Sequence, residues 1–82
     1  MLIVEQIRCA RVLLGWNQEE LATQSGLALG TIKRLESKRG LIGGNADTVW
    51  KIQAALEAAG VIFIPEDDRS GPGVRLAKPS RR

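Results

Sequence analysis

The chain has 82 residues, 12 basic and 9 acidic, which gives a net charge of +3, with one cysteine and no histidine. This length suits a single domain, and a lone cysteine without histidine excludes an internal disulfide and leaves no plausible zinc site. No apolar run approaches a membrane span, and no nucleophile–base pair can be assembled, so we expect a cytoplasmic protein that is not an enzyme and has no cofactor.

The N-terminal residues predict an amphipathic helix over residues 2–14. Apolar side chains recur there at three- and four-residue steps, at Ile3, Ile7, Ala10 and Leu14. Charged residues interrupt the apolar run, so we interpret it as a helix and not as a signal peptide. Cys9 is expected to be a small buried hydrophobic residue.

A helix–turn–helix pattern follows, with helices predicted over residues 18–25 and 29–37. Asn17 stands where an N-cap belongs, and Gly26 is expected to end the first of these helices in the left-handed conformation. At about 100° per residue, the second helix has one apolar side and one basic side that carries no acid. Glu36 falls near the edge of the apolar side, where an unpaired carboxylate is costly, so Arg11 on the first helix is its expected partner.

The rest of the chain predicts one more helix and a hairpin. A helix over residues 46–59 is capped by Asn45 or Asp47 and has an apolar stripe formed by Val49, Ile52, Leu56 and Ala59. The β-prone runs 61–64 and 73–77 predict an antiparallel hairpin around an acidic turn. The fold class is therefore mainly α, with four helices and a C-terminal two-stranded hairpin in one domain over residues 1–77. Residues 78–82 are expected to be a flexible basic tail.

The segment LLGWNQEELATQSGLALGTIKRLESKRG, residues 13–40, resembles the helix-turn-helix domain of Cro and phage-repressor-type (XRE-like) transcriptional regulators. The similarity covers roughly residues 3–60 and rests on Leu14-Gly15, Asn17 to Ala22, Gly26-Leu27, Ile32 and Leu35-Glu36. The hairpin resembles that of a bacterial subgroup of short proteins that append one to this domain. The resemblance implies a lambda-repressor-like fold and sequence-specific binding of double-stranded DNA. It also implies the role of a small transcriptional regulator, with repression as the expected outcome.

The resemblance also implies which residues contact DNA, with the third helix in the major groove. They are Gln18 at a phosphate; Leu29, Gly30 and Arg34 facing bases; Thr31 and Lys33 beside them; and Ser37 and Lys38 at the DNA backbone. It matches Arg11 and Glu36 to a salt bridge between helices. The chain departs from the family at Ala28-Leu29-Gly30, where hydrogen-bonding side chains are common, so we do not expect the first turn to read bases through hydrogen bonds. Leu29 fits either a thymine methyl or the protein core, and Arg34 suits a bidentate contact to guanine.

Some apolar residues are left over once the core stripes are assigned, and they predict a homodimer that binds a palindromic operator. The expected interface residues are Trp50, Ile62, Phe63, Ile64, Val74 and Leu76. Alternatively, the hairpin completes the core of the monomer, because an isolated two-stranded hairpin is only marginally stable. Two other functions stay open: an antitoxin-type autorepressor that binds a toxin, and a protein-interaction module with weak base readout. We expect no small-molecule ligand.

Overall fold

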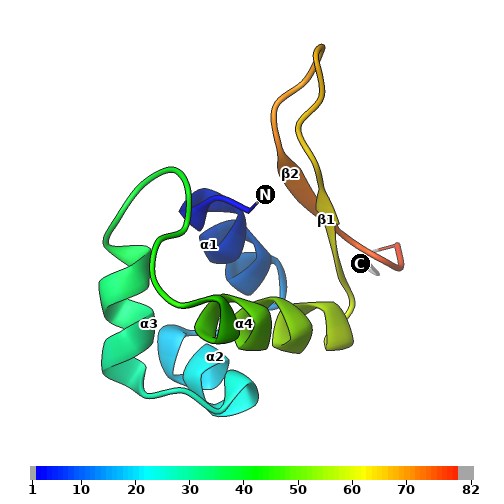
Figure 1. Ribbon diagram of the computed structural model, residues 1–82. Helices are drawn as coiled ribbons and strands as arrows, with labels where there is room; N and C mark the ends of the chain where they lie inside the picture. The colour runs from blue at the N-terminus through cyan, green and yellow to red at the C-terminus, as the bar shows by residue number, and fades with distance from the viewer. Residues whose placement is uncertain (1, 80–82) are drawn as a thin grey trace.

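Four α-helices precede a two-stranded antiparallel sheet in the computed structural model, which describes residues 2–79 (Figure 1). The helices are α1 (Val4–Leu13), α2 (Gln18–Ser25), α3 (Leu29–Glu36) and α4 (Ala46–Ala58), and the strands are β1 (Val61–Ile64) and β2 (Gly73–Leu76). The predicted ends of these elements agree with the structure to within two residues. Most of the basic tail predicted over residues 78–82 lies outside the described residues. No helix among residues 2–79 is long and apolar enough to cross a membrane.

The hydrophobic core draws side chains from every helix and from β1. Its buried apolar members are Val4, Ile7, Ala10, Leu21, Ala22, Ile32, Ile52, Leu56 and Val61. Burial of one large aliphatic side chain contributes about 1.5–3 kcal/mol, so this cluster is the main source of stability. The predicted stripe of α4 is confirmed at Ile52 and Leu56, whereas Ala59 is exposed because the helix ends before it.

Cys9 is exposed, so its predicted burial is wrong. It lies about 200° from Ile7 around the axis of α1, on the side that turns away from the core. Its small apolar character therefore adds nothing to core packing in the monomer.

The hairpin places alternate side chains on two faces. Its register pairs Val61 with Leu76 and Phe63 with Val74, and these four side chains face the helices and pack in or against the core. The intervening side chains of Ile62 and Ile64 face outward and are exposed. The sheet lies with β2 beside α1, and β1 is the outer strand (Figure 1).

A buried glutamine fastens the hairpin to α1. Gln6 is 3% exposed, and its amide nitrogen donates to the carbonyls of Gly73 at 2.9 Å and Ile64 at 3.3 Å. Its amide oxygen accepts the N–H of Ile3 at 2.9 Å, which satisfies a donor at the start of the helix. The same side chain therefore caps α1 and holds the end of the sheet near the turn.

The segment after α3 is tied to the start of α1. The Gly40 carbonyl accepts the N–H of Val4 at 2.8 Å, and the Gly40 N–H donates to the Glu5 carboxylate at 3.1 Å. Hydrogen bonds from the N–H groups of Glu5 itself and Gly40 lower the pKa of Glu5, with a smaller contribution from the nearby positive charges of Arg8 and Arg39. These contacts fix the path of the chain from α3 toward α4.

Candidate nucleic-acid interface

The turn between α2 and α3 sets the direction of the third helix. Asn17 caps α2, because its Oδ1 accepts the N–H of Glu20 at 2.8 Å. Gly26 ends α2 with a φ of 72°, the left-handed conformation predicted for it. The N–H of Leu27 then donates to the Ala22 carbonyl at 3.0 Å, and its side chain packs against the core. Two helices joined by a short glycine turn result, with α3 at one side of the molecule (Figure 1).

The two sides of α3 differ in burial and charge. Ile32 and Glu36 are buried, at 0% and 4% exposure. The opposite side is exposed and carries Gly30, Lys33, Arg34, Ser37 and, just after the helix, Lys38. No carboxylate among residues 2–79 forms a salt bridge with these cations. The exposed side of α3 is therefore positively charged, and its cations are free to meet an external anion.

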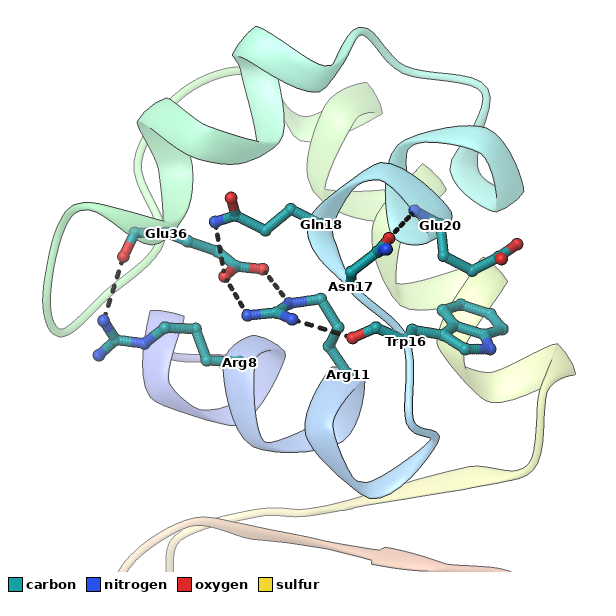
Figure 2. A network of polar contacts seen from close by, with 7 residues as sticks. All are labelled: Arg8, Arg11, Trp16, Asn17, Gln18, Glu20 and Glu36. Carbon is teal, nitrogen blue, oxygen red and sulfur yellow. Dashed lines mark hydrogen bonds and ion pairs between the residues drawn. The ribbon is translucent and has the colours of Figure 1, made fainter.

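Glu36 is the centre of a network that joins three helices (Figure 2). Arg11 of α1 holds its carboxylate in a fork: Nε donates to Oε2 and Nη2 to Oε1, both at 2.9 Å. The side chains are 17% and 2% exposed, so this is the mostly buried ion pair that the angular positions of Arg11 and Glu36 predicted. The third donor of Arg11, Nη1, binds the Trp16 carbonyl at 2.9 Å.

Arg8 adds a second link from α1 to the end of α3. Its Nη1 donates to the main-chain carbonyl of Glu36 at 3.1 Å (Figure 2). The last carbonyls of a helix lack partners within the helix and attract positive charge, so Arg8 acts as a cap for α3. Both arginines lie one turn apart on α1, and together they fix the C-terminal end of α3. This role of Arg8 was not predicted from the sequence.

Gln18 lies inside the network. Its amide nitrogen donates to Oε1 of Glu36 at 3.1 Å, and its side chain is half-buried (Figure 2). The resemblance had matched Gln18 to a phosphate contact. Its main-chain N–H remains at the first turn of α2, where helices favour anions, but the neighbouring Glu19 and Glu20 are exposed acids that oppose an anion. The side chain of Gln18 therefore has a positioning contact in this structure.

The first turn of α3 contains three residues with different surroundings. Leu29 is half-buried and packs against the core, in line with the second of its two predicted roles. Thr31 is half-buried, and Gly30 is exposed in ordinary helical conformation. A Cβ built on Gly30 would meet no atom within 4 Å. The fold itself therefore gives no reason for glycine there, and the open space lies on the side of α3 that faces outward.

A shallow groove of about 230 Å³ runs beside the exposed side of α3. Thr31 and Arg34 line it from α3, Lys38 lines it from just after the helix, and residues 43–45 line it from the loop that precedes α4. The contribution of this loop to a groove beside α3 was not predicted from the sequence. The groove continues the positive surface of α3 toward the start of α4.

The residues predicted to form a dimer interface divide into two groups. Phe63, Val74 and Leu76 are partly buried against the monomer's own core, as expected if the hairpin completes that core. Trp50, Ile62 and Ile64 are exposed, at 66%, 45% and 38%. Trp50 belongs to α4, and Ile62 and Ile64 lie on the outer face of β1. This exposed group is therefore available to another protein chain.

Comparison with protein-family models and with curated proteins finds no match to this chain.

Proposed function

We propose that this protein binds double-stranded DNA sequence-specifically and acts as a small transcriptional repressor. In this proposal α3 enters the major groove, and two copies of the chain bind the two halves of a palindromic operator. Half-sites that lie one helical turn apart suit such a pair of domains, because both third helices then meet the same side of the duplex.

The observation that carries the proposal is the contrast between the two sides of α3. The inner side is anchored through Glu36 to α1 and α2. The outer side presents Lys33, Arg34 and Lys38, which have no carboxylate partner among the described residues. A rigidly held helix with unpaired cations on its exposed side matches what the major groove requires: a fixed direction and positive charge toward the phosphates.

The surroundings of each residue suggest its role on DNA. Arg34 is exposed in the last turn of α3 and suits a bidentate contact to guanine. Lys33 and Lys38 flank it and suit phosphates. Gly30 lets the helix backbone approach the bases closely because no side chain intervenes. Leu29 and Gln18 act chiefly by holding α3, since both already contact their own protein.

Ser37 is also exposed, but its hydroxyl donates to the Arg34 carbonyl at 2.6 Å. Because its proton is already donated, the hydroxyl would reach a phosphate through a bridging water that donates to both oxygens, or would have to rotate to free the proton. We assign Ser37 the weakest part among the proposed DNA contacts.

The test is selection of the tightest-binding duplexes from a random pool, followed by anisotropy measurements at several salt concentrations. We expect a short palindrome, and Arg34→Ala should relax the preference at one base pair of each half-site, with a loss of about 1–3 kcal/mol per contact. Arg69→Ala is the matched control, because it removes the same charge from the exposed tip of the hairpin. If Lys33 and Lys38 of two copies neutralise about four phosphates, log affinity falls against log salt with a slope of about −4.

The other candidate function is a protein-interaction module, and the exposed Trp50 is the observation that favours it. A tryptophan that is 66% exposed is unusual, and aromatic side chains are enriched at protein interfaces. An antitoxin-type autorepressor would combine both functions in one chain. If selection enriches no sequence and Arg34→Ala and Arg69→Ala behave alike, the DNA-reading proposal is wrong and this second candidate takes its place.

A further inference from the structure

The β1 strand has an edge whose backbone groups are unused. The N–H of Ala77 donates to the Gly60 carbonyl at 2.7 Å, which identifies this pair as hydrogen-bonded across the hairpin. Because bonded and non-bonded pairs alternate in an antiparallel ladder, Ile62 and Ile64 also bond toward β2. The N–H and C=O groups of Val61 and Phe63 therefore point to the opposite edge. No hydrogen bond joins these groups to another residue in the described range 2–79.

Apart from its short length of four residues, this edge lacks the usual features that prevent strand pairing. Natural edge strands carry charges, prolines or bulges, or are covered by other elements. The four residues of β1, VIFI, contain no charge, glycine or proline, and Ile62 and Ile64 are 45% and 38% exposed on the outer face. By contrast, β2 contains Gly73 and Arg75 and lies next to α1. Of the two edges of the sheet, that of β1 is the one open to pairing.

We propose that a second copy of the chain pairs with this edge, so that the two hairpins form one four-stranded antiparallel sheet. The proposal deepens the proposed function, which needs two copies, by stating which backbone groups join them. The occupant is a second copy because the edge is complementary to itself. In a symmetric antiparallel pair, Val61 of each copy lies opposite Phe63 of the other, and every free N–H and C=O group of these residues finds a partner.

Neighbouring registers are less favourable, so the edge itself selects this one. A shift that places Phe63 opposite Phe63 of the second copy also sets Val61 opposite Pro65, which has no N–H to donate. A shift the other way places Phe63 opposite Ala59, which has helical dihedrals (φ −83°, ψ −2°) and cannot join a strand. Only the register centred on Ile62 uses all the free groups of both edges.

The side chains around that centre are apolar on both faces of the sheet. On the outer face, Ile62 lies directly opposite Ile62 of the second copy, in a non-bonded pair with Cα atoms about 4.5 Å apart. On the inner face, Phe63 lies beside Val61 of the second copy, so the two hydrophobic cores become continuous. Pairing therefore covers part of the Ile62 side chain, which is 45% exposed in the monomer.

Cysteine cross-linking tests the register directly and uses no DNA. In the full chain with Cys9→Ser, the Ile62→Cys variant should form a disulfide-linked dimer when oxidised glutathione accepts the electrons of the two thiols. The separation expected at residue 62 lies within the Cα range that disulfides span. Ile64→Cys, in the same background, is the matched control. Its two thiols would be separated by four strand residues, roughly 14 Å, and should stay reduced or form mixed disulfides with glutathione.

Sedimentation equilibrium supplies the second measurement. Ile62→Lys sets two like charges opposite each other at the centre and should weaken self-association about tenfold or more. Val12→Lys, on the exposed part of α1, should leave it unchanged. A monomeric native protein, or a dimer that Ile62→Cys does not cross-link and Ile62→Lys does not weaken, overturns the inference. A cross-linked dimer that selects no DNA sequence leaves it intact and counts against the proposed function alone.

Discussion

Replacing Arg11 with alanine is expected to destabilise the protein by about 3–5 kcal/mol, the usual cost of removing one member of a buried ion pair. The Glu36 carboxylate, in a side chain that is 2% exposed, would keep only the Gln18 amide as a donor, at 3.1 Å. The variant also loses the hydrogen bond to the Trp16 carbonyl. At the usual stability per residue, an 82-residue domain has an unfolding free energy of about 4–12 kcal/mol, so the loss is about a quarter of it or more.

Urea unfolding followed by far-ultraviolet circular dichroism measures this free energy. Three variants separate the causes: Arg11→Ala, Arg11→Lys, and Arg11→Met combined with Glu36→Leu. Lysine keeps the positive charge but loses the two-bond contact to the Glu36 carboxylate, so the free energy of unfolding of Arg11→Lys should lie between those of the native protein and Arg11→Ala. The double variant buries no charge and should lie within about 1–2 kcal/mol of the native protein.

Two results would refute the reasoning. One is a loss below about 1 kcal/mol for Arg11→Ala, which would mean that water or a shifted side chain satisfies Glu36 at little cost. The other is a double variant as unstable as Arg11→Ala. In that case the shape and hydrogen bonds of arginine, and not the carboxylate left without its partner, would determine the stability.

Three further predictions concern single residues. Gly26→Ala should lower the free energy of unfolding by about 1 kcal/mol because the φ of Gly26 is 72°. Gly30→Ala should instead stabilise α3 by as much as about 1 kcal/mol and weaken DNA binding. Gln6→Leu should lower stability by about 1–2 kcal/mol and speed amide exchange in the hairpin, because it removes the bonds to the strand carbonyls. Because the pKa of Glu5 is lowered in the folded protein, its carboxylate stabilises the fold at pH values above the ordinary pKa of a glutamate. This stabilisation is lost as the pH falls through the lowered pKa. Thermal unfolding across acidic pH should therefore show a smaller pH dependence for Glu5→Gln.

Each of these predictions has an outcome that contradicts it. Equal losses for Gly26→Ala and Gly30→Ala would mean that backbone conformation does not distinguish the two glycines. Unchanged hairpin exchange in Gln6→Leu would mean that packing of the inner strand face alone holds the sheet. Parallel pH curves for native protein and Glu5→Gln would show that the contact with Gly40 contributes no pH-dependent stability.

The positions of the helices and strands follow from signals within a few residues of each other. Asn17 and Gly26 are predictable because each acts on its own helix end, through a side-chain oxygen in one case and a left-handed φ in the other. The pairing of Arg11 with Glu36 was predictable for a different reason. Each charge interrupts an apolar stripe, and two such interruptions on facing helices satisfy one another.

Other features depend on contacts that sequence spacing does not reveal. Gln6 is a polar residue beside an apolar stripe, and its partners lie 58 and 67 residues further along the chain. Only the docked position of the hairpin shows why burial of this amide is tolerated. The groove beside α3 depends likewise on the path of residues 37–45, which Gly40 fixes against α1. Leu29 had two possible environments, and the packing of the first turn decided between them.

The network around Glu36 separates two tasks that one short helix must perform. On α3 this network uses only the inward-facing side chain and the main-chain carbonyl of Glu36, and it involves no outward-facing side chain of the helix. The outer positions 30, 33, 34 and 38 can therefore be exchanged without disturbing what holds the helix in place. Under the proposed function, substitutions at these positions change the DNA-binding surface one residue at a time while the contacts that hold α3 stay the same. New binding specificities are then accessible through substitutions that carry little stability cost.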